Sequence, residues 1–318
     1  RSSDLDFFWD YQRSLDLATA QVTVDYQANW HFFKREVIAH LIEDRILVRL
    51  TASGHPFNLS VSLDRTLDPD CRLGFEGAVG GLTMDGRIEG GIDFRVQVAC
   101  RSAGGTVTPR DGRFLDCVGV KELILAVNIG TSAKGVTPAA ECGDLRVPDA
   151  EWGDLVEAHR REHRRHYGGL TLKVPAPVPD VPTDRRIEAF RAGQSDPGLP
   201  LLYFQYGRYL LCAATAKADL PPNLQGKWNE DLYPPWESDL HQDVNLQMNY
   251  WPAEAGALQA YTNALFTHME NFVAHGRKAA RDLYGCEGIW LPIQTDPWGR
   301  ATPEAFGWAV WIGAAPWL

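Results

Sequence analysis

The densest group of residues capable of chemistry lies between positions 220 and 251. Three tryptophans alternate there with several amides and with five acids, Glu230, Asp231, Glu237, Asp239 and Asp243. Flat aromatic faces stack on sugar rings, and amides or carboxylates hydrogen-bond to hydroxyl groups. Tryptophan and proline also build rigid loop cores. Composition alone therefore leaves a sugar-binding site and a purely structural loop equally open.

A second pattern, from His159 to His163, has the H-x-x-E-H spacing of some zinc proteases. Arg164, Arg165 and His166 follow at once. A zinc site needs neutral histidines in a shaped cavity, which a run of cations does not favour. We therefore expect a solvated basic helix here and no metal site. No glycine-rich loop has phosphate-binding spacing, and we expect no cofactor.

The secondary structure that must position these residues changes along the chain, from predicted strands in the first half to predicted helices in the second. The first half contains short segments rich in valine, isoleucine and aromatic residues, separated by glycine and proline. The predicted strands cover 19–26, 36–41, 45–51, 58–63, 93–100, 113–118 and 122–128. This spacing predicts a β-sandwich.

Helical patterns begin after Pro148. The segment 149–166 has helical character, and 173–182 is a proline-rich linker that cannot enter a helix. Helices are then expected from Thr183, over 201–216, and over 257–284 as one helix or two. Strands followed by helices favour separate β and α domains.

Charge and hydropathy limit the class of partner. The net charge of −10 argues against nucleic acid, and no apolar run is long enough to insert into a membrane. The six cysteines show neither zinc spacing nor the density of a disulfide scaffold. The chain begins with Arg1 and ends on an apolar segment, 307–318, so we expect a fragment truncated at both ends.

Three motifs carry a resemblance to a known family. The chain reads L-P-P-N-L-Q-G-K-W-N at 220–229, P-P-W at 234–236 and H-Q-D-V-N-L-Q-M-N-Y-W-P-A-E at 241–254. They closely resemble glycoside hydrolase family 95, the α-L-fucosidases that act on 1,2-linked fucose. The family pattern is L-P-A-N-L-Q-G-x-W-N, P-P-W and H-x-N-x-N-L-Q-M-N-Y-W-P-A-E. Further family-like segments lie at 11–20, 183–191, 202–211, 276–280 and 295–299.

The resemblance implies a multi-domain architecture, β then α. An N-terminal β-sandwich is expected over 1–148 and a helical, proline-rich linker over 149–182. The N-terminal part of an incomplete (α/α)6 catalytic barrel is expected over 183–318. The family location also suggests an extracellular or periplasmic protein, whose partner is a fucosylated oligosaccharide or glycan.

The resemblance further implies an inverting mechanism, in which a glutamic acid protonates the leaving oxygen. An aspartate, working with the two asparagines of H-x-N-x-N, activates water. His241 matches the motif histidine and Asn245 the second asparagine, but Asp243 occupies the position of the first. Asp243 could accept the proton of water directly, alone or together with a later aspartate, or it could only bind a sugar hydroxyl. The family's glutamic acid and aspartate lie in later motifs without a match here, so we expect these 318 residues alone to be inactive.

Other side chains are candidates for substrate binding. Trp228, Asn229, Trp236 and Trp251 could line the sugar subsite, while Asp296 and Trp298 lie on a loop that could face the barrel mouth. Each could instead hold loops together. The activity also has alternatives, because the change to Asp243 is compatible with an α-L-galactosidase or another α-L-glycosidase on the same scaffold. A non-catalytic glycan-binding protein is the alternative outside enzymes.

Overall fold

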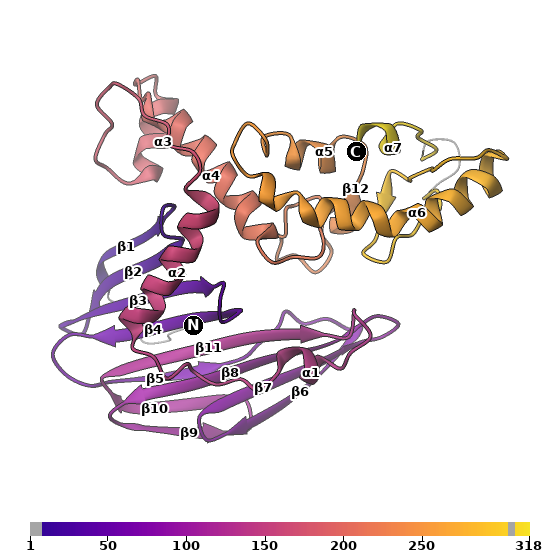
Figure 1. Ribbon diagram of the computed structural model, residues 1–318. Coiled ribbons are helices and arrows are strands. Elements are labelled where there is room, and N and C mark those ends of the chain that lie inside the picture. The colour runs from indigo at the N-terminus through magenta and orange to yellow at the C-terminus, as the bar shows by residue number, and fades with distance from the viewer. Residues whose placement is uncertain (1–7, 305–308) are drawn as a thin grey trace. The chain divides into compact units, whose positions relative to one another are not determined.

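The computed structural model describes residues 8–304 and 309–318. The chain divides into two compact units, Arg1–His163 and Arg164–Leu318. Figure 1 shows the strands of the first unit and the helices of the second. An antiparallel sheet domain is thus followed by a helical region, which agrees with the predicted order of β and α structure.

The first unit is built from two antiparallel sheets. One sheet has the strand order β1-β2-β3-β4-β11-β8-β7-β6, and the other has the order β5-β10-β9. The strands are β1 (Phe8–Asp16), β2 (Gln21–Ala28), β3 (His31–His40), β4 (Arg45–Ala52), β5 (Phe57–Ser62), β6 (Cys71–Ala78), β7 (Gly81–Ile88), β8 (Asp93–Ala103), β9 (Thr106–Arg110), β10 (Phe114–Val120) and β11 (Glu122–Thr131).

The large sheet buries both of its faces at strand β11. Successive side chains of a strand point to opposite faces, so an apolar run can serve two cores. Leu123 packs with Phe57 and Val120 of the small sheet, which makes a sandwich core. Ile124, the next residue, packs on the other face in a separate cluster. The sequence Glu122–Thr131 is accordingly apolar without alternation.

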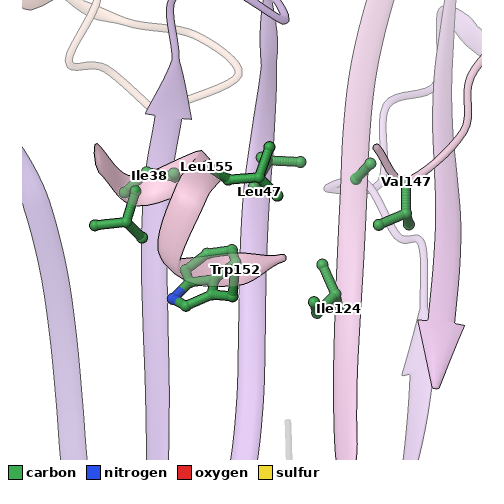
Figure 2. Close-up of a cluster of buried hydrophobic side chains, with 8 residues drawn as sticks. Ile38, Leu47, Ile124, Val147, Trp152 and Leu155 are labelled. Carbon is green, nitrogen blue, oxygen red and sulfur yellow. The ribbon is translucent and has the colours of Figure 1, made fainter. Parts of the chain in front are cut away.

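Helix α2 (Trp152–Tyr167) covers that second face. Trp152 and Leu155 lie over Ile38 of β3, Leu47 of β4 and Ile124 of β11, as Figure 2 shows. The short helix α1 (Pro138–Cys142) also packs on β8 and β11. Its approach requires a glycine in β11, since a Cβ on Gly130 would lie 2.3 Å from the carbonyl oxygen of Pro138.

The expectation of a solvated basic helix at the H-x-x-E-H pattern was right for Arg161, Arg164 and Arg165, which are exposed, and wrong for the two histidines. His159 and His163 are buried on the face of α2 that is turned toward Leu17 and His40. His163 Nε2 lies 2.9 Å from the carbonyl oxygen of Leu17, and the ring of His159 lies 6.0 Å from that of His40. Within residues 8–304 and 309–318, no group of three His, Cys, Asp or Glu side chains could hold a metal ion.

The second unit is mostly helical. Its elements are α3 (Thr183–Arg191), α4 (Gly198–Thr215), the short 3-10 turn η1 (Pro235–Ser238), β12 (Leu240–His241), α5 (Asn245–Tyr250), η2 (Gln259–Tyr261), α6 (Asn263–Tyr284), β13 (Gln294–Thr295) and α7 (Ala314–Trp317). Helix α6 is a single element, which resolves the choice left by the sequence. In the described part of the chain, no helix has the length and apolar character to cross a membrane.

Buried arginines connect the helices of the second unit. Arg208 of α4 is fully buried, and its guanidinium donates to the carbonyl oxygens of Gly256 at 2.7 Å and Tyr167 at 3.0 Å. Arg186 of α3 forms a bidentate pair with Asp196, at 2.8 and 3.0 Å. Asp196 also accepts the backbone N–H of Gly198, the first residue of α4. The Arg186–Asp196 ion pair therefore fixes where α4 begins, and the hydrogen bonds of Arg208 to backbone carbonyls hold the buried face of α4 in place.

Candidate active site

A cavity of about 460 Å³ lies in the second unit, beside the family-like motifs. This volume is in the range of small-ligand pockets. Its charged lining residues are the acids Glu237, Asp239, Asp296 and Glu304 and the cations Lys227 and Arg300. Lys227 donates its ammonium to the carbonyl oxygen of Ala214 at 2.8 Å, and burial lowers the pKa of Lys227. The excess of acids suits a neutral, hydroxyl-rich ligand better than an anion.

A short antiparallel pairing brings the two sides of this cavity together. In it, Leu240 of β12 faces Thr295 of β13, and His241 faces Gln294. The backbone N–H of Gln242 continues the pairing by donating to the carbonyl oxygen of Ile293 at 2.6 Å. Residues distant in sequence, 239–241 and 294–296, are thereby held at one site.

Asn223 organises the loop that carries the first motif. Its side-chain oxygen accepts the backbone N–H groups of Gln225 at 3.1 Å and Lys227 at 2.9 Å, a turn that asparagine favours. The adjacent Leu224 donates its N–H to the carbonyl oxygen of Asp239 at 2.8 Å. The L-P-x-N-L-Q-G motif therefore has a structural role, which is to seat this loop against the histidine segment.

His241 lies between two carboxylates. Its Nδ1 is 3.2 Å from both carboxylate oxygens of Asp239, and its Nε2 is 3.1 Å from Oδ1 of Asp243. The ring of Trp236 packs against the imidazole at 5.8 Å, close to perpendicular. The Asp239 and His241 side chains are 9% and 11% exposed, whereas that of Asp243 is 40% exposed. Burial raises the pKa of Asp239, and hydrogen bonds to Gln294 and His241 act against that rise.

The backbone is strained between Asp243 and Asn245. Val244 has φ +93°, a region that β-branched residues rarely occupy. The strain is held by Gln247, whose side-chain oxygen accepts the Val244 N–H at 3.0 Å while its amide donates to the carbonyl oxygen of Gln242 at 2.8 Å. Strained backbone that neighbouring contacts maintain is concentrated at functional sites. Asn245 follows as the first residue of α5.

The remaining site residues expected from the sequence are distributed around this centre. Asp296 lines the cavity, and its Oδ1 accepts the backbone N–H of Trp298 at 2.9 Å and of Arg300 at 3.2 Å. Trp298 itself is exposed. Asp296 is thus the loop residue beside the cavity, while the indole of Trp298 lies at the surface.

The other site residues expected from the sequence do not line the cavity: Trp228, Asn229, Trp236, His241, Asp243, Asn245, Trp251 and Trp298. Trp228 and Trp251 are exposed, and the Trp251 ring packs edge-on against Trp317 at 6.3 Å. Asn229 accepts the backbone N–H of Asp231 at 2.5 Å, which stabilises its own turn. The structure brings Trp236, His241 and Asp243 together. The contacts of Trp251 and Asn229 lie with other residues.

Asp239 is a site residue that the sequence argument did not select. The signal for it was present as the spacing D-x-H-x-D, because alternate residues of an extended segment point to one side. Asp239 was counted among the acids of the region, but nothing in the resemblance assigned it a role. Lys227 and Arg300 were also not selected, and only the folded loop shows that they line the cavity.

Comparisons with known proteins identify the family of the region that contains the candidate site. The model of the glycosyl hydrolase family 95 catalytic domain matches residues 151–318, more than half of the chain. The model of the glycosyl hydrolase family 65 N-terminal domain matches residues 2–136. The candidate cavity and the histidine segment both lie inside the first match.

Similar curated proteins carry fucosidase names. Alpha-L-fucosidase 2 of Arabidopsis thaliana is 29% identical over 97% of this chain and 41% of its own length. Probable alpha-fucosidase A of Aspergillus niger is 25% identical over 99% of this chain and 42% of its own. The chain therefore spans about two fifths of the length of these relatives.

A solved structure supports the fold. A putative kojibiose phosphorylase from human microbiome superposes with a TM-score of 0.59 at 12% identity, over 96% of this chain and 41% of that one. Identity this low concerns the fold alone. The family match, which covers more than half of the sequence, shows that the chain belongs to glycosyl hydrolase family 95.

Proposed function

We propose that the protein is an inverting glycoside hydrolase that removes terminal, 1,2-linked α-L-fucose from glycans. The family and the fucosidase names of its relatives support hydrolysis of a fucoside. In this proposal the helical region forms part of an (α/α)6 barrel, and the domain limits are 1–148, 149–182 and 183–318. The chain contributes the side of the site that handles water.

The observation that carries the proposal is the contact between Asp243 and His241. An inverting enzyme needs a carboxylate that is fixed in orientation and still reaches water. Asp243 meets both needs, since one oxygen contacts Nε2 of His241 at 3.1 Å and 40% of its side chain is exposed. Asn245, two residues further on, would hold the same water or a sugar hydroxyl. An asparagine at 243 could not accept a proton, but an aspartate can.

A panel of aryl α-L-glycosides, assayed with the full-length protein, tests the substrate. We expect the α-L-fucoside to be cleaved with a higher kcat/KM than the α-L-galactoside. Faster cleavage of the galactoside would favour the second candidate, an α-L-galactosidase, for which the change to Asp243 is the supporting observation. A pocket built around a methyl group separates these sugars only modestly, so both should be measured side by side. Binding of fucosylated glycans without any cleavage would support a non-catalytic protein instead.

A further inference from the structure

Asp239 contacts Nδ1 of His241, the histidine whose Nε2 faces Asp243, the proposed catalytic carboxylate. We propose that Asp239 is a positioning residue that holds a proton on Nδ1 of His241 and so fixes the imidazole against Asp243. The link to catalysis rests on the proposed function. The arrangement of protons does not, because it follows from the contacts alone.

The geometry places the imidazole between a buried and a half-exposed carboxylate. Both oxygens of Asp239 are 3.2 Å from Nδ1, and Oδ1 of Asp243 is 3.1 Å from Nε2. The Asp239 end is rigid, since its backbone carbonyl accepts from Leu224 and its N–H donates to Trp236. Asp243 instead precedes Val244, whose backbone is strained at φ +93°.

The proton on Nδ1 of His241 follows from the hydrogen-bonding chemistry of the imidazole and the two carboxylates. An ionised carboxylate only accepts hydrogen bonds, and each imidazole nitrogen donates only when it carries a proton. The buried carboxylate of Asp239 needs a donor, because an unpaired charge with 9% exposure is costly. The donors that face this carboxylate are Nδ1 of His241, which lies 3.2 Å from both of its oxygens, and the side-chain amide of Gln294. The other charged groups around the cavity are Glu237, Asp296 and Glu304, with Lys227 and Arg300 of opposite sign.

A proton fixed on Nδ1 has a consequence for Nε2. A buried aspartate that holds the Nδ1 proton of a histidine sets its tautomer and ring orientation in acyl-transfer enzymes, and loss of that charge gives the wrong tautomer. Here the nitrogen so oriented faces Asp243. When the imidazole carries a proton on both nitrogens, Nε2 donates to one oxygen of ionised Asp243. The other oxygen of that carboxylate then remains available to water.

The test is nitrogen NMR of the histidine rings in the 318-residue protein at neutral pH. With ¹⁵N-labelled histidine, the His241 signals are assigned by their loss in His241→Asn. We expect Nδ1 to be protonated in the wild type and to lose that proton in Asp239→Asn, whose amide can donate to Nδ1. Asp231→Asn, an exposed acid of the same loop, should leave the His241 signals unchanged. An unprotonated Nδ1 in the wild type, or an unchanged spectrum in Asp239→Asn, overturns the proposal.

Two further arms keep the result decisive. If Asp239→Asn does not fold, the wild-type spectrum still decides whether Nδ1 carries the proton. In the full-length protein, Asp239→Asn should lower kcat for an aryl α-L-fucoside by about 100-fold or more, with KM changed by less than about threefold. A rise in KM with unchanged kcat would contradict a positioning role. If the wild type cleaves no fucoside, the proposed function fails, and the NMR result stands or falls by itself.

Discussion

At the scale of single residues, Asp243 distinguishes this chain from its family pattern. Asp243→Asn restores the residue of the family pattern. It replaces a carboxylate, which can accept a proton, with an amide, which cannot. We expect kcat of the full-length protein on an aryl α-L-fucoside to fall by about 10² to 10⁴-fold, the usual contribution of a general base. Steady-state kinetics of the variant would measure it.

The matched control is Asp231→Asn, which also neutralises one carboxylate of the same region and should leave kcat unchanged. Unchanged turnover in Asp243→Asn would mean that Asp243 is not the base. A raised KM with unchanged kcat would identify it as a ligand of a sugar hydroxyl.

The sequence could predict only part of the site. His241 and Asp243 were predicted because the motif fixes their positions, and the structure places their side chains 3.1 Å apart. Asp239 required knowledge that the segment is extended and paired with β13, which depends on residues more than fifty positions away. Trp236 and Trp251 look equivalent in sequence, yet only Trp236 contacts the histidine ring.

At the scale of elements, the docking of α2 on the large sheet is a defined packing unit. Leu155→Ala removes a buried side chain that packs with Ile38 and Leu47. We expect the free energy of unfolding to fall by about 2 to 5 kcal/mol, since large-to-small changes in a core leave a cavity. Urea unfolding followed by circular dichroism would measure the loss.

Leu172→Ala is the control, because Leu172 lies in the loop after α2 and is exposed. It should change the free energy of unfolding by no more than about 0.5 kcal/mol. Equal losses in the two variants would show that α2 is not docked as described.

The patterns of the elements explain both the correct predictions and the errors. Strand β11 was predicted because its valines, leucines and isoleucines are typical of a strand buried on both faces. Strands β6 and β7 were not predicted, because glycines interrupt both sequences and weaken a strand pattern. Helix α2 was predicted, but its buried face was not. His159 and His163 continue the stripe of Trp152, Leu155 and Val156, and they were taken as polar.

At the scale of the whole molecule, each compact unit buries a neutral histidine. Burial lowers the pKa of His159 in the first unit and of His268 in the second to about 4. The unfolded chain binds a proton at either histidine near pH 6.5, and the folded chain binds it only near 4. The free energy of unfolding should therefore decrease as the pH falls from about 6.5 to about 4. Each histidine accounts for a loss of about 3 kcal/mol once the pH is below about 4.

Urea unfolding at neutral pH and at about pH 5 would measure this loss. His159→Gln should reduce the pH dependence of the first unit, and His268→Gln that of the second, because glutamine does not titrate. The matched control is His55→Gln, because His55 is exposed in a bend between two strands. Stability that is constant or higher at pH 5 would contradict neutral burial of these histidines.

Inversion at the anomeric carbon is the central claim, and the first sugar released tests it most directly. The full-length protein would be mixed with an α-1,2-fucosylated oligosaccharide and followed by ¹H NMR before mutarotation is complete. Attack by water on the face opposite the leaving group predicts that β-L-fucose appears first, with the α anomer growing in later. Initial release of α-L-fucose would contradict an inverting mechanism, and release of no fucose would contradict the proposed activity.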